Sequence, residues 1–198
     1  MITSNEFVQK LIDAAKNHKT VYANGMFGHL ITEEIVSQKA QQLPGWYTAS
    51  RQADLRELIG KEYFGFDCVC LVKGILWGWN GDASKKYGGA VYQSNGVPDI
   101  TEGQMINVCS GASSDFSSLV PGEFLWMQGH CGVYIGDGLA VECTPKWDNC
   151  VQITAVGNLG AKSGYNSRTW TKHGKLPYVE YVPVSYTHLR AHETRSNL

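Results

Sequence analysis

The hydrophobic positions follow a helical period in the first half of the chain and a strand-like alternation in the second half. Over residues 3–17, apolar side chains recur three and four positions apart, and Thr3 followed by Glu6 matches a capping box. This pattern predicts a helix there, and the patterns at residues 32–43, 50–59, 67–78 and 100–108 predict further helices. Residues 78–98, rich in Gly, Asn, Ser and Tyr, are expected to form a long surface excursion.

From Glu123 onward the pattern is typical of strands. Short runs of alternating or continuous apolar residues occupy 123–128, 130–136, 139–144 and 151–156, with further segments near Trp170 and at 178–182. Helices followed by neighbouring strands predict an α+β fold in which N-terminal helices pack on a central antiparallel sheet. The sequence shows no internal repeat.

The segment 130–144 predicts a β-hairpin whose register follows from its polarity. A two-residue turn at Asp137-Gly138 pairs Gly136 with Leu139 and mixes polar with apolar residues on both faces. A three-residue loop at 136–138 instead pairs Ile135 with Leu139, and also Val133 with Val141 and Cys131 with Cys143, on one apolar face. We predict this second register, because a slip of one residue moves every side chain to the other face.

In that register the opposite face carries two residues of chemical interest. His130 and Glu142 become diagonal neighbours, whose backbones lie roughly 7–8 Å apart, within reach of long side chains. The small residues Gly132 and Ala140 lie between them. We therefore expect a helix end to approach the imidazole closely across this face.

Cys68 is the candidate nucleophile. It lies where a glycine-containing turn, which ends at Asp67, enters an apolar helical pattern. Unpaired N–H groups and the helix dipole at such a position favour the thiolate. Cys70, two residues on, points to another side of the helix and is interpreted as packing. A cysteine, a histidine and a carboxylate together are typical of a cysteine hydrolase.

These motifs resemble a known family. The run Asp67-Cys68-Val69-Cys70-Leu71-Val72 resembles the Asp-Cys-Ser-Gly-Leu-Val signature of NlpC-type cell-wall endopeptidases, which are papain-like cysteine peptidases. Residues 129–138 resemble that family's histidine strand, and Glu142 lies twelve residues after His130, where its third catalytic residue falls. Residues 22–25 and 121–125 resemble its Tyr-Val-Trp-Gly and Pro-Gly-Asp-Leu segments, so the resemblance runs from about residue 22 to 156.

Two features depart from the family pattern. The third catalytic residue of the family is commonly His, Asn or Gln, whereas a glutamate such as Glu142 is typical of the related CHAP group of amidases and peptidases. The stretch between Tyr22 and Cys68 is also longer than usual, which predicts an inserted helical segment near the substrate groove.

The resemblance implies a papain-like hydrolase of bacterial peptidoglycan that cuts a stem-peptide amide and needs no metal or cofactor. Cys68 is then the nucleophile, His130 the base and Glu142 the residue that orients the imidazole. The expected oxyanion and substrate contacts are Tyr22, Asp67, Trp147 and Trp170. Two alternatives remain open: an N-acetylmuramoyl-L-alanine amidase of CHAP type, and a catalytically idle wall-binding module. The intact Cys-His-Glu set disfavours the second alternative.

Composition limits the remaining function classes. The 198 residues are 43% hydrophobic with a net charge of −1, so we expect one catalytic domain over 1–182, which acts as a monomer and has no nucleic-acid partner. No apolar run approaches a membrane span, and the first residues lack a secretory signal, which predicts synthesis in the cytoplasm. With the resemblance, this favours a phage or prophage endolysin that reaches the wall through a holin.

The six cysteines are expected to be free thiols, with Cys131 and Cys143 as the one pair close enough to bond. A zinc site at Cys68, Cys70 and His130 is disfavoured, because Cys-x-Cys is closer than the usual ligand spacing. Residues 183–198 break from the preceding pattern and resemble translated sequencing-adapter DNA from metagenomic assemblies. We interpret them as a non-native tail that replaces a lost continuation, and we assign no metal site to its His188 and His192.

Overall fold

The structure is a computed structural model that describes residues 1–183. Nearly all of the predicted non-native tail, including His188 and His192, lies outside the described residues, so its origin stays a prediction. In the described part, helices and strands form a mixed α+β fold.

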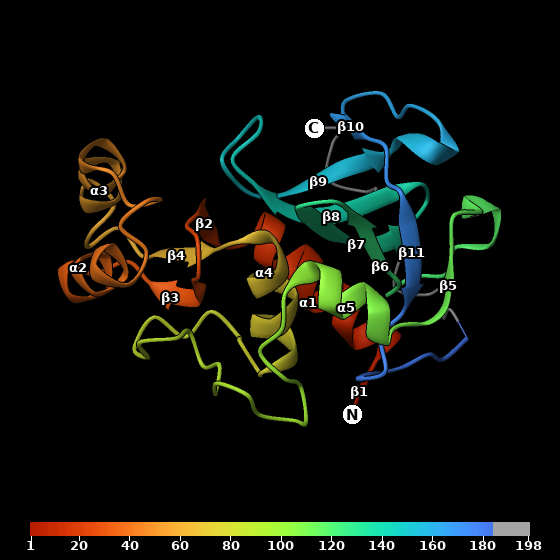
Figure 1. Ribbon diagram of the computed structural model, residues 1–198, viewed down its shortest axis with the longest axis horizontal. Coiled ribbons are helices and arrows are strands. Elements are labelled where there is room, and N and C mark those ends of the chain that lie inside the picture. Colours follow the sequence, from red (N-terminus) through yellow and green to blue (C-terminus); the bar gives the residue numbers. More distant parts are fainter. Residues whose placement is uncertain (184–198) are drawn as a thin grey trace, which may run out of the picture.

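The largest layer is a seven-stranded sheet with the order β10-β9-β8-β7-β6-β11-β5 (Figure 1). Its neighbours pair antiparallel, except for β10 and β9, which are parallel. The strands are β5 Ser110–Ser113, β6 Phe124–Met127, β7 His130–Gly136, β8 Leu139–Thr144, β9 Cys150–Val156, β10 Ser167–Arg168 and β11 Lys172–Lys175. The predicted central antiparallel sheet is therefore present, and β6 to β9 have bounds close to the expected ones, whereas β5 was not predicted.

Five helices accompany the sheets: α1 Ser4–Lys16, α2 Glu33–Gln42, α3 Ala49–Arg56, α4 Cys68–Leu76 and α5 Glu102–Val108. Each falls inside a predicted helical segment, except that α3 begins one residue earlier than predicted. Thr3 caps α1, and the predicted capping box with Glu6 is formed. A short parallel pair, β1 Ile2–Thr3 with β12 Val179–Glu180, ties the two ends of the described chain together.

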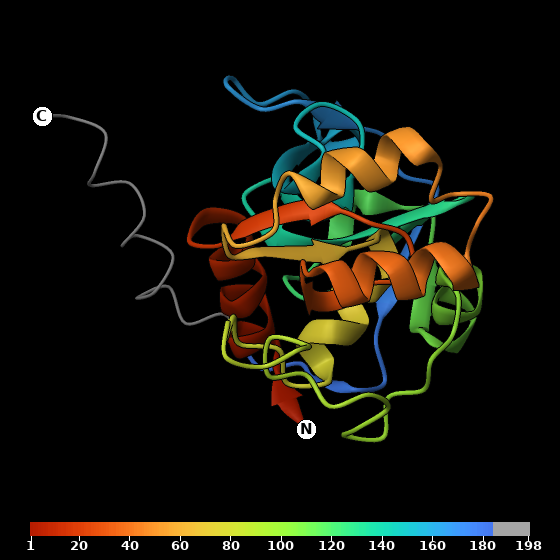
Figure 2. The same cartoon turned by 90° about the vertical axis from the view of Figure 1, so that its left-hand side faces the viewer.

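A second, three-stranded sheet was not predicted from the sequence. It has the order β2-β4-β3, with β2 Lys19–Tyr22 parallel to β4 Tyr63–Phe66, and β3 Phe27–Leu30 antiparallel to β4. The expectation of helices alone before residue 123 is therefore wrong. Helices α2 and α3 lie between β3 and β4 in the sequence and form the predicted inserted segment, at the end of the molecule that faces the viewer in Figure 2.

The hairpin between β7 and β8 has the predicted face assignment but not the predicted loop. Val133 pairs with Val141 and Tyr134 with Ala140, as expected, yet Gly136 rather than Ile135 pairs with Leu139. Asp137 and Gly138 both have positive φ, at 51° and 72°, as a two-residue type I′ turn requires. An irregularity between Tyr134 and Gly136 restores the register, so a bulge takes up the extra residue.

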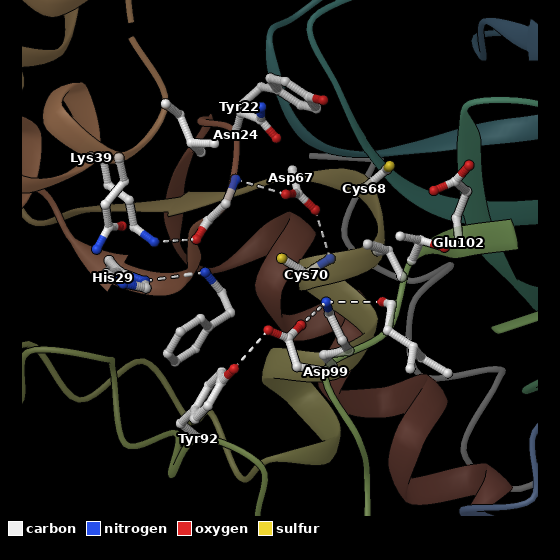
Figure 3. A pocket seen from close by; sticks show the side chains of 18 of the residues that line it. Tyr22, Asn24, His29, Lys39, Asp67, Cys68, Cys70, Tyr92, Asp99 and Glu102 are labelled. Carbon is white, nitrogen blue, oxygen red and sulfur yellow. Dashed lines mark hydrogen bonds and ion pairs between the residues drawn. The ribbon is translucent and has the colours of Figure 1, made fainter. Parts of the chain in front are cut away.

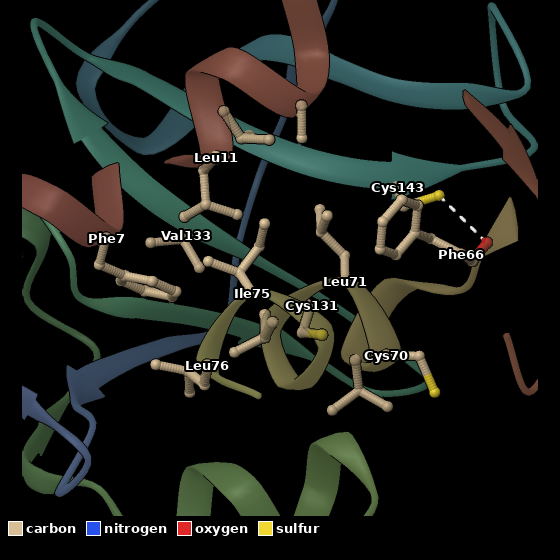
Figure 4. Packing of buried hydrophobic residues seen from close by; sticks show 14 of the residues in the cluster. Phe7, Leu11, Phe66, Cys70, Leu71, Ile75, Leu76, Cys131, Val133 and Cys143 are labelled. Atoms are coloured by element: carbon tan, nitrogen blue, oxygen red, sulfur yellow. Dashed lines mark hydrogen bonds between the residues drawn. The ribbon is translucent and has the colours of Figure 1, made fainter. Parts of the chain in front are cut away.

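Helix α4 packs on the apolar face of this hairpin. Its buried side chains form one core cluster with Cys131, Val133, Val141 and Cys143 (Figure 4). The expectation that a helix approaches across Gly132 is therefore wrong. On that opposite face, Trp170 fills the space, since a Cβ at Gly132 would lie 3.0 Å from its ring.

Two further expectations concern the state of the cysteine thiols and the presence of a membrane-spanning helix. All six cysteines, including Cys131 and Cys143, are free, and the Cys143 thiol donates to the Phe66 carbonyl at 3.3 Å. Among residues 1–183, no helix is long and apolar enough to cross a membrane.

Candidate active site

Cys68 is the first residue of α4, directly after β4 has ended at Phe66. The Asp67 side chain caps the helix: one carboxylate oxygen accepts from the Cys70 N–H at 2.7 Å, and the other accepts from the Gly25 N–H at 2.8 Å. Asp67 thus ties the start of α4 to the loop after β2. Because the first N–H groups of a helix have no intrahelical acceptor, the Cys68 thiol lies at the positive end of the helix.

His130 and Glu142 are in contact, as the hairpin register predicted. His130 Nε2 lies 2.6 Å from Glu142 Oε2, and the Glu142 side chain is fully buried. A carboxylate only accepts hydrogen bonds, so Nε2 carries the proton that this bond requires. Nδ1 is then the ring nitrogen left to exchange a proton with Cys68.

Two residues that the sequence pattern did not indicate complete the surroundings of Glu142. Arg168 Nε donates to Glu142 Oε2 at 2.6 Å, and Thr154 Oγ1 donates to Oε1 at 2.7 Å. A buried carboxylate is costly unless it is paired, so this ion pair allows Glu142 to stay charged. Thr154 pairs with Ala140 and so lies diagonal to Glu142, which a predicted register for β8 and β9 would have shown, whereas no periodic pattern identified Arg168.

Aromatic rings hold this ion pair in place. Trp170 stacks on His130 with 5.7 Å between ring centroids and 11° between planes, and the Arg168 guanidinium lies over Trp147 and Trp170 at 5.1 and 5.7 Å. Trp170 is only 3% exposed. Trp170 was expected to contact the substrate, but its buried ring packs on His130 and Arg168.

The charge state of Cys68 differs from that of the other cysteines. A hydrogen bond from the Cys131 thiol and another from His130 outweigh burial and lower the pKa of Cys68 to about 6. Burial opposes the charged imidazole, but the bonds to Cys68 and Glu142 prevail and raise the pKa of His130. Opposite shifts of this kind favour a thiolate-imidazolium pair near neutral pH. The sequence placed Cys131 on the apolar face opposite Cys143, and its effect on the Cys68 pKa was not anticipated.

Cys68 opens into a cavity of about 840 Å³ between the inserted segment and the α4–α5 region (Figure 3). Tyr22 and Asp67 line this cavity beside Cys68, and Gly129 places the start of β7 at its edge. The Tyr22 pKa is raised, first by burial and then by the charge of Cys68. Trp147 lies against Arg168 instead and is not among the residues that line the cavity.

Within residues 1–183, no group of three or more His, Cys, Asp or Glu side chains is arranged to hold a metal ion. The chemistry available at the site is that of a thiolate, an imidazole and a paired carboxylate, next to a cavity of ordinary ligand size.

Comparisons with known proteins found no similar sequence and only a distant similarity to a solved structure. No protein-family model matches the chain, and no curated protein matches it significantly in sequence. Among solved structures, NlpC1 from Trichomonas vaginalis aligns with a TM-score of 0.40 and 11% identity, over 87% of this chain and 44% of that one. The chain therefore spans less than half the length of that protein.

Proposed function

We propose that this protein is a cysteine hydrolase of NlpC type with a papain-like arrangement, which cuts an amide bond in the stem peptides of bacterial peptidoglycan. The observation that carries the proposal is the position of Cys68 at the start of α4, next to a histidine held by a buried carboxylate, and the lowered pKa of Cys68 agrees with it. The sequence motifs around Cys68 and His130 support peptidoglycan as the substrate.

In the proposed reaction, the Cys68 thiolate forms a bond to the scissile carbonyl carbon, and the π electrons of the C=O bond move onto the carbonyl oxygen. The backbone N–H of Cys68 donates to this oxyanion, with the Tyr22 hydroxyl as a second donor. His130 Nδ1–H then protonates the leaving amine, the C–N bond breaks, and a thioester remains on Cys68. A water molecule, deprotonated by His130, attacks the thioester and releases the acid, which regenerates the thiolate-imidazolium pair.

Glu142 fixes the proton on Nε2 and stabilises the imidazolium, while Arg168 and Thr154 keep the carboxylate in one orientation. Trp170 limits rotation of the ring through its stacking contact. Of the predicted substrate contacts, Tyr22 and Asp67 keep this role in the proposal. Trp147 acts through Arg168.

The alternative with specific support is an N-acetylmuramoyl-L-alanine amidase, because a glutamate as third residue is typical of the CHAP group. A catalytically idle wall-binding module has less support, since a binder has no need for a cysteine with a lowered pKa. In either enzymatic reading, the protein acts as a monomer on the wall, and holin-dependent release from the cytoplasm is part of the proposal.

Digestion of purified sacculi tests the proposal. Wild-type protein and the Cys70→Ala variant should solubilise sacculi, whereas Cys68→Ala should not, although it folds. Mass spectrometry of the products separates the two enzymatic readings, because an endopeptidase creates new N-termini within the stem and an amidase frees lactyl groups. An active Cys68→Ala protein would contradict the proposal.

A further inference from the structure

The cavity at Cys68 extends to the inserted helix α2, where a lysine side chain forms part of its wall. Lys39 lines the cavity, and its ammonium donates to the Gly25 carbonyl at 2.6 Å. Among residues 1–183, no carboxylate lies within ion-pair distance of Lys39. An ammonium has three donors, so this single bond leaves donor capacity free.

The acidic groups of the cavity are engaged elsewhere or lie on another wall. Asp67 accepts two backbone N–H groups, and Asp99 pairs with Lys73 and accepts from the Tyr92 hydroxyl at 2.8 Å. Glu102 is on the far side of Asp67 from Lys39 in the close view (Figure 3). Burial is the main cause that lowers the pKa of Lys39, as expected for a cation that lacks a compensating anion.

His29 adds a neutral donor to the same wall. Its Nδ1 accepts from the Phe27 N–H at 3.1 Å, so the proton of the neutral ring lies on Nε2. Burial, then the charges of Lys39 and Lys86, lower the pKa of His29 to about 3, which keeps the ring neutral at physiological pH. His29 also lines the cavity.

We propose that Lys39, with the Nε2–H of His29 beside it, forms a subsite for a carboxylate of the substrate, away from the bond that Cys68 attacks. The inference rests on the proposed function and names its substrate class: stem peptides whose side carboxylate is free rather than amidated. A carboxylate there supplies the missing counter-charge of Lys39, whereas a carboxamide does not. Lys39 on α2 and His29 on β3 both lie between Tyr22 and Cys68, the stretch that is longer than in the family pattern.

A purely structural role for Lys39 has a different signature. If Lys39 only holds the Gly25 loop, and through it the Asp67 cap, its loss lowers the stability of the fold and weakens the binding of all ligands equally. If it binds a carboxylate, its loss removes the difference between charged and amidated ligands. The ratio of two affinities therefore separates the two roles.

The test uses the full chain with Cys68→Ala, so that ligands bind without turnover. The probes are two synthetic stem peptides that differ only in a side carboxylate or carboxamide, and calorimetry at low salt gives each Kd. We expect about tenfold tighter binding of the carboxylate form, as for a hydrogen bond to a charged group. Lys39→Met should abolish this ratio and Lys39→Arg should retain most of it. Lys85→Gln is the matched control, because Lys85 pairs with Asp82, does not line the cavity and is not among the charges that act on His29, and it should leave the ratio unchanged.

Equal binding of the two peptides to the protein with Lys39 intact would overturn the inference, as would a ratio that survives Lys39→Met. Failure to bind either peptide would overturn it too. Digestion of sacculi by the unmodified protein distinguishes this result from failure of the proposed function. If sacculi are digested and the ratio is one, only the carboxylate subsite is wrong.

Discussion

The ionisation of Cys68 gives the sharpest prediction, because the surroundings of the six cysteines differ so much. The pKa of Cys68 is lowered to about 6, whereas burial raises the pKa of Cys109 to about 12 and also raises those of Cys70, Cys131, Cys143 and Cys150. Thiolates, rather than thiols, react with alkylating agents. Cys68 should therefore be alkylated first, despite being only 8% exposed.

The size of the difference follows from these values. At pH 7, a thiol with a pKa of about 6 is roughly 90% ionised, while one with a pKa of about 12 is ionised in about one molecule in 10⁵. The lower intrinsic reactivity of a low-pKa thiolate reduces this advantage but does not remove it. Cys68 should dominate labelling from about pH 6 upward, and its rate should fall as pH drops below about 6.

The assay is iodoacetamide labelling of the native protein from pH 4 to 9, followed by peptide mass spectrometry that gives a rate for each cysteine. Substitutions then test the cause of the shift. Since the Cys131 thiol makes the largest contribution to lowering the Cys68 pKa, Cys131→Ala should move the labelling midpoint upward. Cys131→Ser, which keeps a donor, should move it less.

Two results would refute this reasoning. A Cys68 midpoint near 9, the ordinary value for a thiol, would show that neither Cys131 nor His130 stabilises the thiolate. Faster labelling of the half-buried Cys150 at every pH would show that exposure, rather than ionisation, decides the reactivity.

Three further predictions concern the supports of the site. Arg168→Met leaves the buried Glu142 without its cation and should cost about 3–5 kcal/mol of stability, measured by denaturant unfolding; an unchanged midpoint would show that the ion pair contributes nothing. Glu142→Gln should lower kcat on sacculi by about 10–10³-fold with little change in KM, and full activity would remove Glu142 from the mechanism. Val133→Asp places a charge in the core shared by the hairpin and α4 and should unfold the domain, seen as loss of the cooperative thermal transition, whereas a folded variant would contradict the assigned face.

Local patterns predicted the parts of the fold that depend on local physics. The capping box at Thr3 and Glu6 and the helix that begins at Cys68 are formed as expected, because caps and apolar periods are properties of neighbouring residues. The contact between His130 and Glu142 followed from parity, since only one register gave a fully apolar face. The predicted three-residue loop at 136–138 was wrong, because a two-residue turn with a bulge before it places the side chains on the same faces as a longer turn does.

Features that depend on distant segments were not predictable in this way. Strands β2 and β4 are four residues long and pair in parallel across the inserted helices, so neither length nor spacing identified them. Arg168 reaches Glu142 from a two-residue strand in a turn-rich stretch, where no periodicity exists. Trp170 lies in the same turn-rich stretch, and nothing in the sequence indicated that its ring packs on His130.

The central claim, that Cys68 is the nucleophile of a peptidoglycan hydrolase, is tested most directly by trapping its acyl intermediate. Purified sacculi are incubated with the wild-type protein and with Cys68→Ala, the reaction is quenched in acid, and peptide mass spectrometry searches for a muropeptide fragment attached to the cysteine peptides. The account predicts a thioester on Cys68 alone, and soluble muropeptides only with the wild-type protein. Soluble muropeptides from Cys68→Ala, or a fragment attached to Cys70 instead, would contradict it.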